Sequence, residues 1–184
     1  MFAYRTRTAL AAVAVCAFSL VARAEMIDNP TYKAWAAQKV GTSVKMRMLS
    51  EAAGNKTKME TTTTLTELTP DKAVVEAKTT MEVSGQKMDL PAQKQEIPAK
   101  IDNAGKGTTG PKPDVKESEE TVDVGGKSYK CKVTESTSEA GGNKTTAKVW
   151  MCPEVPGGMV KMVSNTDGQI KSTTTMELVE VAAK

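Results

Sequence analysis

Apolar and polar residues alternate along much of the chain after residue 42, and each alternating stretch predicts a β-strand with one buried face. In the first stretch, Val44, Met46 and Met48 are separated by polar residues. Residues 73–83 alternate in the same way, with Val74 as the exception. Because successive side chains of a strand point to opposite faces, this period of two places the apolar residues on one side of a sheet.

Short turn signals separate these stretches and leave no room for helices between them. The turn signals are Gly54-Asn55, Pro70-Asp71, Ser84-Gly85, Gly125-Gly126, Gly141-Gly142 and Asp167-Gly168. Strands joined by such tight turns run antiparallel to their neighbours. The pattern therefore predicts an all-β domain. We expect a curved antiparallel meander of roughly eight to ten strands, arranged as a half-barrel or a sandwich.

One short helix is predicted ahead of the first strand. Asn29 is suited to cap it, Pro30 to occupy its first turn and Gly41 to end it. Tyr32 and Trp35 lie three residues apart and form an aromatic stripe. We expect this stripe to pack against the sheet.

Residues 91–117 interrupt the alternating pattern. The segment contains four prolines and three glycines, which favour turns and irregular backbone. We expect it to be a long connection between two groups of strands. A connection of this length is also suited to serve as a lid or a binding loop.

The beginning of the chain has the pattern of a secretory signal peptide. Arg5 and Arg7 form a basic start without acidic residues, and an apolar run follows over residues 9–21. Ala22-Arg23-Ala24 then offers small residues at the positions that signal peptidase requires. Residues 1–24 are therefore predicted to be removed during export.

We place the cleavage between Ala24 and Glu25, which leaves residues 25–184 as a single β domain. An uncleaved membrane anchor is the alternative, but the apolar run is shorter than the span of about 20 residues that a bilayer requires. We expect the mature protein to be periplasmic or secreted, by bacterial export, and to have no membrane span.

Removal of the signal peptide changes the charge balance. The full sequence has 25 Lys and Arg against 22 Asp and Glu, and Arg5, Arg7 and Arg23 are lost with the signal peptide. The mature chain is then formally neutral. Because nucleic-acid binding depends on an excess of basic residues, we expect no nucleic-acid partner.

Cys131 and Cys152 are the two cysteines that follow the signal peptide. Two cysteines in one small exported domain usually form a disulfide. If Gly141-Gly142 is a two-residue hairpin loop, the cysteines face each other across the hairpin, at a separation that a disulfide tolerates. The same register sets Val133 opposite Trp150, a favourable cross-strand pair. Redox-active or metal-binding thiols are the alternative.

The sequence contains no histidine, which removes the commonest general base and the commonest metal ligand. No cofactor motif is present either. We therefore expect a protein that is not an enzyme and has no cofactor. A hydrolytic enzyme that uses a carboxylate pair such as Glu119-Glu120 ranks lowest among the functions considered.

Methionine is unusually frequent, with 11 residues in the chain. Met46 and Met48 share one face of a predicted strand, and the first hairpin sets Met59 opposite Met48 if its register matches that of the second. Thioether sulfurs are soft ligands that suit Cu(I), so these three residues are candidates for a soft-metal site. The interpretation that we favour is that methionine fills the core of a sheet that is poor in phenylalanine and isoleucine and that no metal is bound, with the soft-metal site as the alternative.

Two segments resemble a group of uncharacterised exported bacterial β proteins. One is a hairpin with the pattern Gly-Gly-x-x-Tyr-x-Cys, which spans residues 125–131. The other combines Trp150 with a Pro-Gly-Gly-x-Val-Lys segment at residues 156–161. This resemblance implies export and a β fold, and it implies no function. More remotely, the chain is similar to periplasmic lipoprotein-carrier half-barrels, which bind lipids.

Together these features predict an exported, non-enzymatic envelope protein. We expect it to bind an apolar ligand or a partner protein on the curved sheet. A methionine-based copper carrier is the alternative function.

Overall fold

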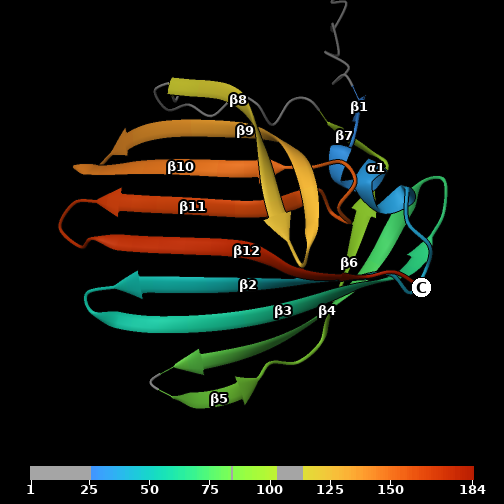
Figure 1. Ribbon diagram of the computed structural model, residues 1–184, viewed down its shortest axis with the longest axis horizontal. Coiled ribbons are helices and arrows are strands. Elements are labelled where there is room, and N and C mark those ends of the chain that lie inside the picture. The colour runs from blue at the N-terminus through green and yellow to red at the C-terminus, as the bar shows by residue number, and fades with distance from the viewer. Residues whose placement is uncertain (1–25, 84, 103–113) are drawn as a thin grey trace, which may run out of the picture.

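The computed structural model describes residues 26–83, 85–102 and 114–184, which form one large antiparallel sheet, one short helix and a separate pair of short strands (Figure 1). The predicted signal peptide over residues 1–24 and its cleavage point between Ala24 and Glu25 lie outside the described residues. In the part of the chain that is described, no helix is long and apolar enough to cross a membrane.

Ten strands form the large sheet. They are β2 (Ser43–Ala52), β3 (Asn55–Leu68), β4 (Lys72–Val83), β5 (Gln86–Asp89), β6 (Gln93–Pro98), β8 (Asp114–Val124), β9 (Lys127–Ala140), β10 (Asn143–Met151), β11 (Met159–Asp167) and β12 (Ser172–Ala182). Their order is β5-β4-β3-β2-β12-β11-β10-β9-β8, and β6 pairs with β4 beside β5. Over the described residues the sheet stays open, and the predicted all-β antiparallel meander is confirmed.

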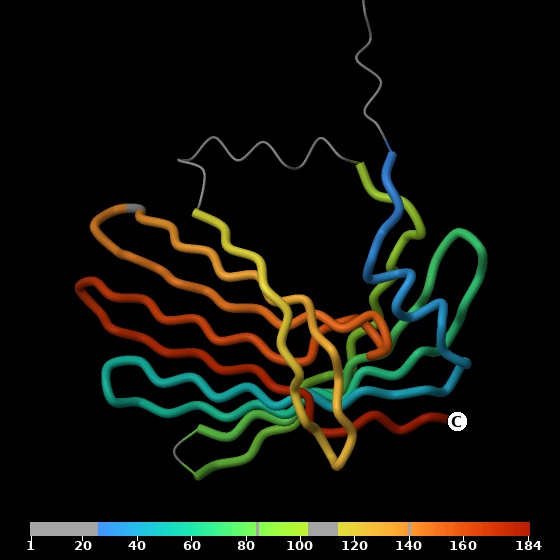
Figure 2. The backbone as a smooth tube through the Cα atoms, turned by 45° about the horizontal axis from the view of Figure 1, so that its top comes forward, coloured from blue at the N-terminus to red at the C-terminus, as the bar shows by residue number. Residues whose placement is uncertain are grey.

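The sheet is strongly curved at the end formed by β8 and β9. These two strands bend away from β10, and their connecting turn comes close to β12 (Figure 2). Within the described strands of the large sheet, the pairing of β2 with β12 is the one that joins strands far apart in sequence, and it lies in the middle of the sheet. It therefore joins the first group of hairpins to the last.

The predicted register of the second hairpin is confirmed. Gly141 and Gly142 form its two-residue loop, with φ angles of 59° and 77° that favour glycine. Ala140 is opposite Asn143, and Val133 is opposite Trp150. The first hairpin has the same geometry, so Met59 is directly opposite Met48 as predicted.

Helix α1 (Pro30–Ala36) begins where the sequence predicts and ends earlier than predicted. Asn29 caps it, with its side-chain oxygen accepting a hydrogen bond from the Thr31 backbone N–H at 3.0 Å. The predicted end at Gly41 is wrong. Gly41 donates its backbone N–H to the Leu65 carbonyl oxygen at 2.8 Å, so the chain already pairs with β3 at this point, just ahead of β2.

The segment over residues 91–117 contains more regular structure than a plain connection. It holds β6, β7 (Lys100–Asp102) and the start of β8, and β7 pairs with β1 (Met26–Asp28) in a two-stranded sheet. Residues 103–113 lie outside the described residues. The strand β6 escaped sequence analysis because it is an edge strand in which Ile97 alone is buried, so it shows no alternating pattern.

The hydrophobic core lies where α1, the β10–β11 loop and the curved end of the sheet meet. Its most deeply buried side chains are Leu65, Val133, Val155, Val160, Cys131 and Cys152. None of the methionines of the described residues is fully buried. The prediction that methionine fills the core therefore holds only for Met46, which is half-buried and packs against the core cluster.

Candidate functional site: a cavity and a row of methionines

The two faces of the sheet differ in chemistry. The helix face, which α1 covers, carries Val44, Met46 and Met48 together with their cross-strand partners. The charged face carries Lys45, Arg47 and the residues opposite them. This division follows directly from the alternation along β2, because neighbouring side chains of a strand point to opposite sides.

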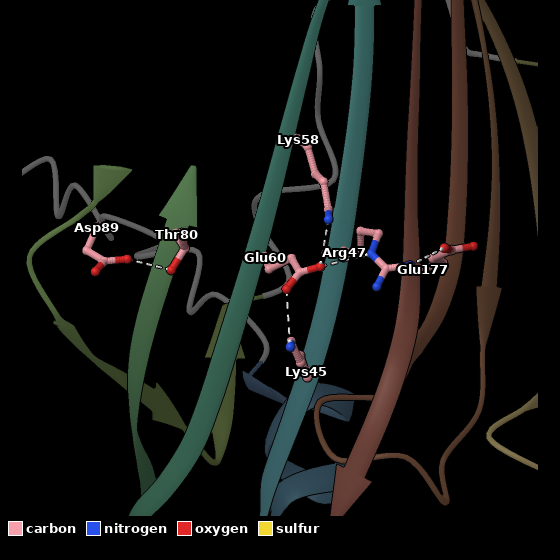
Figure 3. A network of polar contacts seen from close by, with 7 residues as sticks. All are labelled: Lys45, Arg47, Lys58, Glu60, Thr80, Asp89 and Glu177. Atoms are coloured by element: carbon pink, nitrogen blue, oxygen red, sulfur yellow. Dashed lines mark hydrogen bonds and ion pairs between the residues drawn. The ribbon is translucent and has the colours of Figure 1, made fainter. Parts of the chain in front are cut away.

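An ion-pair cluster around Glu60 occupies the charged face (Figure 3). Its carboxylate lies 3.1 Å from Lys45 Nζ, 3.1 Å from Arg47 Nε and 3.3 Å from Lys58 Nζ. Hydrogen bonds from these three cations lower the pKa of Glu60 to about 2. A carboxylate held this firmly in its charged form is a poor general acid or base near neutral pH, so we assign the cluster a structural role.

A cavity of about 550 Å³ lies on the helix face, between α1 and the sheet. It is bordered by α1, β2, β3, β4, β6, β12, the loop between β10 and β11 and the start of β11. Its apolar lining includes Trp35, Val44, Met46, Val75, Ile97 and Met176. The volume falls within the range of about 300–1,000 Å³ that is usual for pockets that bind small molecules.

Two of the polar side chains around the cavity have partners within the chain. The Asn29 amide donates to the Pro98 carbonyl oxygen at 2.8 Å, and Glu96 forms an ion pair with Lys72 at 2.6 Å. Thr31, Thr63 and Gln95 line the cavity as well. The larger part of the lining is apolar, with a few polar groups among the apolar side chains.

The indole N–H of Trp35 differs from these groups because it belongs to a buried residue. The residue is 3% exposed, and among the described residues no group accepts a hydrogen bond from its Nε1 atom. Trp150 shows the usual arrangement, because its Nε1 atom donates to Glu120 Oε2 at 2.7 Å. Since buried indole N–H groups normally have partners, the Trp35 N–H is an unsatisfied donor in a residue that lines the cavity.

The loop between β10 and β11 fixes the position of Trp35. The Cys152 N–H donates to the Gly158 carbonyl oxygen at 2.7 Å, which closes the loop. Gly157 has a φ angle of 76°, and a Cβ atom placed on it would lie 3.2 Å from Trp35 Nε1. The Pro-Gly-Gly segment thus combines a backbone conformation that favours glycine with close packing against the indole ring.

Six methionines form a row across six neighbouring strands of the helix face. In spatial order they are Met88 (β5), Met81 (β4), Met59 (β3), Met48 (β2), Met176 (β12) and Met162 (β11). Each one is directly opposite the next, so all six point to the same side. We call these six residues the methionine row.

The structure confirms one part of the predicted methionine cluster and changes another. Met48 and Met59 are directly opposed, whereas Met46 is opposite Thr61 and Leu178 and lines the cavity instead. Met176 was missed, because only the β2–β12 pairing brings it opposite Met48 and no local pattern indicates that pairing. Met81 was missed because a register shift between Leu65 and Glu67 defeats simple counting from the β3–β4 turn.

Cys131 lies in β9, and Cys152 directly follows the last residue of β10. The last pair of these two strands is Met151 with Lys132, so the same register, continued by one residue, sets Cys152 opposite Cys131. Both thiols are free and buried in the structure. Burial is the main cause that raises the pKa of the Cys131 thiol, and electrostatic repulsion from Cys152 and Glu120 raises it further. The protonated thiol is therefore favoured, which is unsuited to nucleophilic chemistry. The disulfide remains a prediction.

The candidate carboxylate pair Glu119-Glu120 does not form a common site. Glu120 accepts hydrogen bonds from Lys148 and Trp150, each at 2.7 Å, and adjacent residues of a strand point to opposite faces. Within the described ranges, no group of three or more Cys, Asp or Glu side chains is arranged to hold a metal ion.

No protein-family model and no curated protein matches this chain. Among solved structures, a Bacteroides fragilis protein that is provisionally assigned as exported and has a YmcC-like fold is 11% identical, with a TM-score of 0.45 over 79% of this chain and 97% of that chain. A Parabacteroides distasonis protein that is provisionally assigned as a lipoprotein is 14% identical, with a TM-score of 0.42 over 79% of this chain and 96% of that chain. A LolA superfamily protein from Nitrosomonas europaea is 8% identical, with a TM-score of 0.26 over 84% and 92%. Likeness at this level carries no conclusion about function.

Proposed function

We propose that this chain is an exported binding protein that takes the apolar chain of a fatty acid into the cavity on the helix face. One observation carries the proposal, namely an apolar cavity of about 550 Å³ with a buried, unpartnered indole N–H at its wall. Removing apolar ligand surface from water contributes about 25 cal/mol per Å². Met46, Met159 and Met176 add flexible side chains that adapt to such a ligand.

The Trp35 indole N–H supports a ligand with a polar end. A purely hydrocarbon ligand would leave this buried donor without a partner. A carboxylate or ester oxygen would accept its hydrogen bond, and a hydrogen bond to a charged oxygen contributes about 1.5–3 kcal/mol. We therefore favour a fatty acid, oriented with its carboxyl group toward Trp35.

Export is part of the proposal, and the signal pattern over residues 1–24 supports it. Action by binding without catalysis is also part of it. The pKa of Glu60 is lowered to about 2 because three cations pair with its carboxylate. This carboxylate lies on the face opposite the cavity. We infer binding without catalysis because ion pairs hold the carboxylates at both places in the described part of the chain, Glu96 at the cavity and Glu60 on the charged face.

Titration of the purified protein with palmitate tests the proposal. We expect saturable binding, followed by calorimetry or Trp fluorescence, with one site per chain. Thr63→Trp should abolish it because Thr63 lines the cavity. Thr62→Trp is the matched control, since Thr62 is the next residue of β3 and points to the charged face.

A second variant tests the orientation of the ligand. Trp35→Phe keeps an aromatic ring in α1 and removes the donor, so we expect palmitate affinity to fall about tenfold. Absence of saturable binding, or equal binding by the two threonine variants, would overturn the proposed function. An unchanged affinity in Trp35→Phe would overturn the orientation alone.

A further inference from the structure

We propose that the methionine row holds a soft monovalent metal ion, Cu(I), with Met48 as the central ligand and Met59 and Met176 as its flanking ligands. Strand β2 lies between β3 and β12, and Met48 is directly opposite Met59 on one side and Met176 on the other. This arrangement brings three thioether groups together from three neighbouring strands.

The spacing of the strands allows the three sulfurs to converge. Neighbouring strands lie about 4.8 Å apart, and directly opposed Cβ atoms are separated by about 5 Å. A methionine sulfur stands two bonds beyond Cβ on a flexible side chain. The two flanking side chains can therefore lean toward Met48 and share one ion above β2.

The exposure of these methionines separates them from ordinary core residues. Met48, Met59 and Met176 are half-buried, whereas the fully buried core consists of other residue types. Half-buried thioethers are reachable from solvent and remain shielded enough to keep a weakly hydrated ion. Core packing alone does not account for six methionines aligned across six strands, of which Met88 is exposed and the others are half-buried.

The neighbours of the row favour a soft ion over a hard one. On the helix face, Met48 is flanked along β2 by Met46 and Ser50, and Ser50 shares a hydrogen bond with Thr174 at 3.2 Å. Mg²⁺ and Ca²⁺ require carboxylate or carbonyl oxygens, which these side chains do not provide. Thioether sulfur is the ligand that selects Cu(I).

The metal site adjoins the proposed fatty-acid site and shares Met176 with it. Met176 lines the cavity, but Met48 and Met59 lie outside it. Met48→Leu should therefore remove the metal site and leave palmitate binding unchanged. Leucine has a similar volume to methionine, so the substitution keeps the packing of β2.

Competition with the chelator bicinchoninate under reducing conditions tests the proposal. We expect the purified protein to take up one Cu(I) per chain, and Met48→Leu to weaken this binding by about tenfold or more. Met26→Leu is the matched control because Met26 lies in β1, away from the row. Equal Cu(I) affinity in the wild type and Met48→Leu would overturn the proposal.

The cysteines need a control of their own, because reduced thiols also bind Cu(I). The double variant Cys131→Ala and Cys152→Ala should keep its Cu(I), and loss of the metal in a folded double variant would place the site at the thiols instead. Methyl-labelled methionine provides a second measurement in the wild type. With Ag(I) as a stable soft-ion probe, the methyl signals of Met48, Met59 and Met176 should shift together at one equivalent. Shifts spread evenly over all methionines, Met26 included, would contradict a defined site.

Discussion

Trp150 Nε1 donates a hydrogen bond to Glu120 Oε2 at 2.7 Å, and this contact connects β10 to β8 across the intervening strand β9. The other carboxylate oxygen accepts from Lys148 Nζ, also at 2.7 Å. The Lys148 and Lys161 amines lie 4.8 Å and 5.3 Å from the centre of the Trp150 ring. The carboxylate thus satisfies a buried indole N–H and a nearby cation at the same time, which holds the curved end of the sheet together.

Glu120→Ala should destabilise the protein by about 1–3 kcal/mol, because it leaves the indole N–H of the buried Trp150 without an acceptor. Urea unfolding followed by Trp fluorescence measures the free energy of unfolding. Glu119→Ala is the matched control. Glu119 is exposed and points to the other side of β8, so its removal should change the free energy by less than about 0.5 kcal/mol. Equal losses in the two variants would contradict the role of the Trp150 contact.

The Glu60 cluster predicts a pH dependence of stability. The pKa of Glu60 is lowered to about 2 in the folded protein, from 4.5 for the unperturbed group. Its stabilising contribution is therefore complete above about pH 4.5 and is lost as the pH falls toward 2, because the unfolded chain takes up the proton first. Glu60→Gln should be less stable than the wild type at pH 6, by at most about 1 kcal/mol.

The difference between Glu60→Gln and the wild type should shrink as the pH is lowered from 5 to 2.5. Urea unfolding at several pH values measures this. Glu51→Gln serves as a control, because Glu51 forms a looser ion pair with Lys56, at 3.6 Å on the exposed hairpin. A difference at pH 6 that persists undiminished at pH 2.5 would contradict the lowered pKa.

Local counting along the chain predicted the pairs that depend on a two-residue hairpin loop. Met48 with Met59 and Val133 with Trp150 were found in this way, because such a loop leaves one register open to the flanking strands. Met176 was out of reach of this reasoning. Its position opposite Met48 depends on the pairing of β2 with β12, and those strands are separated by most of the chain.

The candidate cavity was also beyond local reasoning. The pattern around Asn29 and Pro30 predicted where α1 begins, and the aromatic stripe correctly indicated that Trp35 packs toward the sheet. The unpartnered state of the Trp35 N–H is a property of all its neighbours in space. The residues beside Trp35 in the sequence do not indicate this unpartnered state. The role of Gly157 and Gly158 is also hidden in the sequence, because these glycines contact α1 only in the folded structure.

Gly157→Ala should destabilise the protein more than Gly126→Ala. Both glycines have similar backbone angles, with φ of 76° and 80°, so both substitutions introduce the same backbone strain of about 1 kcal/mol. A Cβ atom at Gly157 also approaches Trp35 Nε1 to 3.2 Å, whereas nothing lies within 4 Å of one at Gly126. We expect roughly 1 kcal/mol of additional loss at Gly157, because the buried indole ring has little space to move.

Fluorescence distinguishes this packing effect from general destabilisation. In a Trp150→Phe background, the emission reports Trp35 alone, and Gly157→Ala should shift it while Gly126→Ala should not. Equal unfolding free energies for the two variants, together with unchanged Trp35 emission, would show that the loop does not position the ring.

The disulfide prediction concerns the same curved end of the sheet. Cys131 and Cys152 are buried, and the register of β9 and β10 directs them toward each other. In an oxidising compartment we expect these thiols to form a bond that closes a loop of about 20 residues, worth roughly 3 kcal/mol in reduced entropy of the unfolded chain. Protein recovered from an export route should therefore show one bridged peptide pair in non-reducing peptide mapping.

The free energy of unfolding provides a second test of the disulfide. The double variant Cys131→Ala and Cys152→Ala should match the reduced wild type in free energy of unfolding, and both should fall below the oxidised wild type by roughly 3 kcal/mol. The raised pKa of Cys131 slows spontaneous air oxidation, because the thiolate is the reactive form, so bridge formation should depend on an oxidising catalyst. Two free thiols in exported protein, treated with such a catalyst, would show that the ladder does not bring the sulfurs within bonding distance.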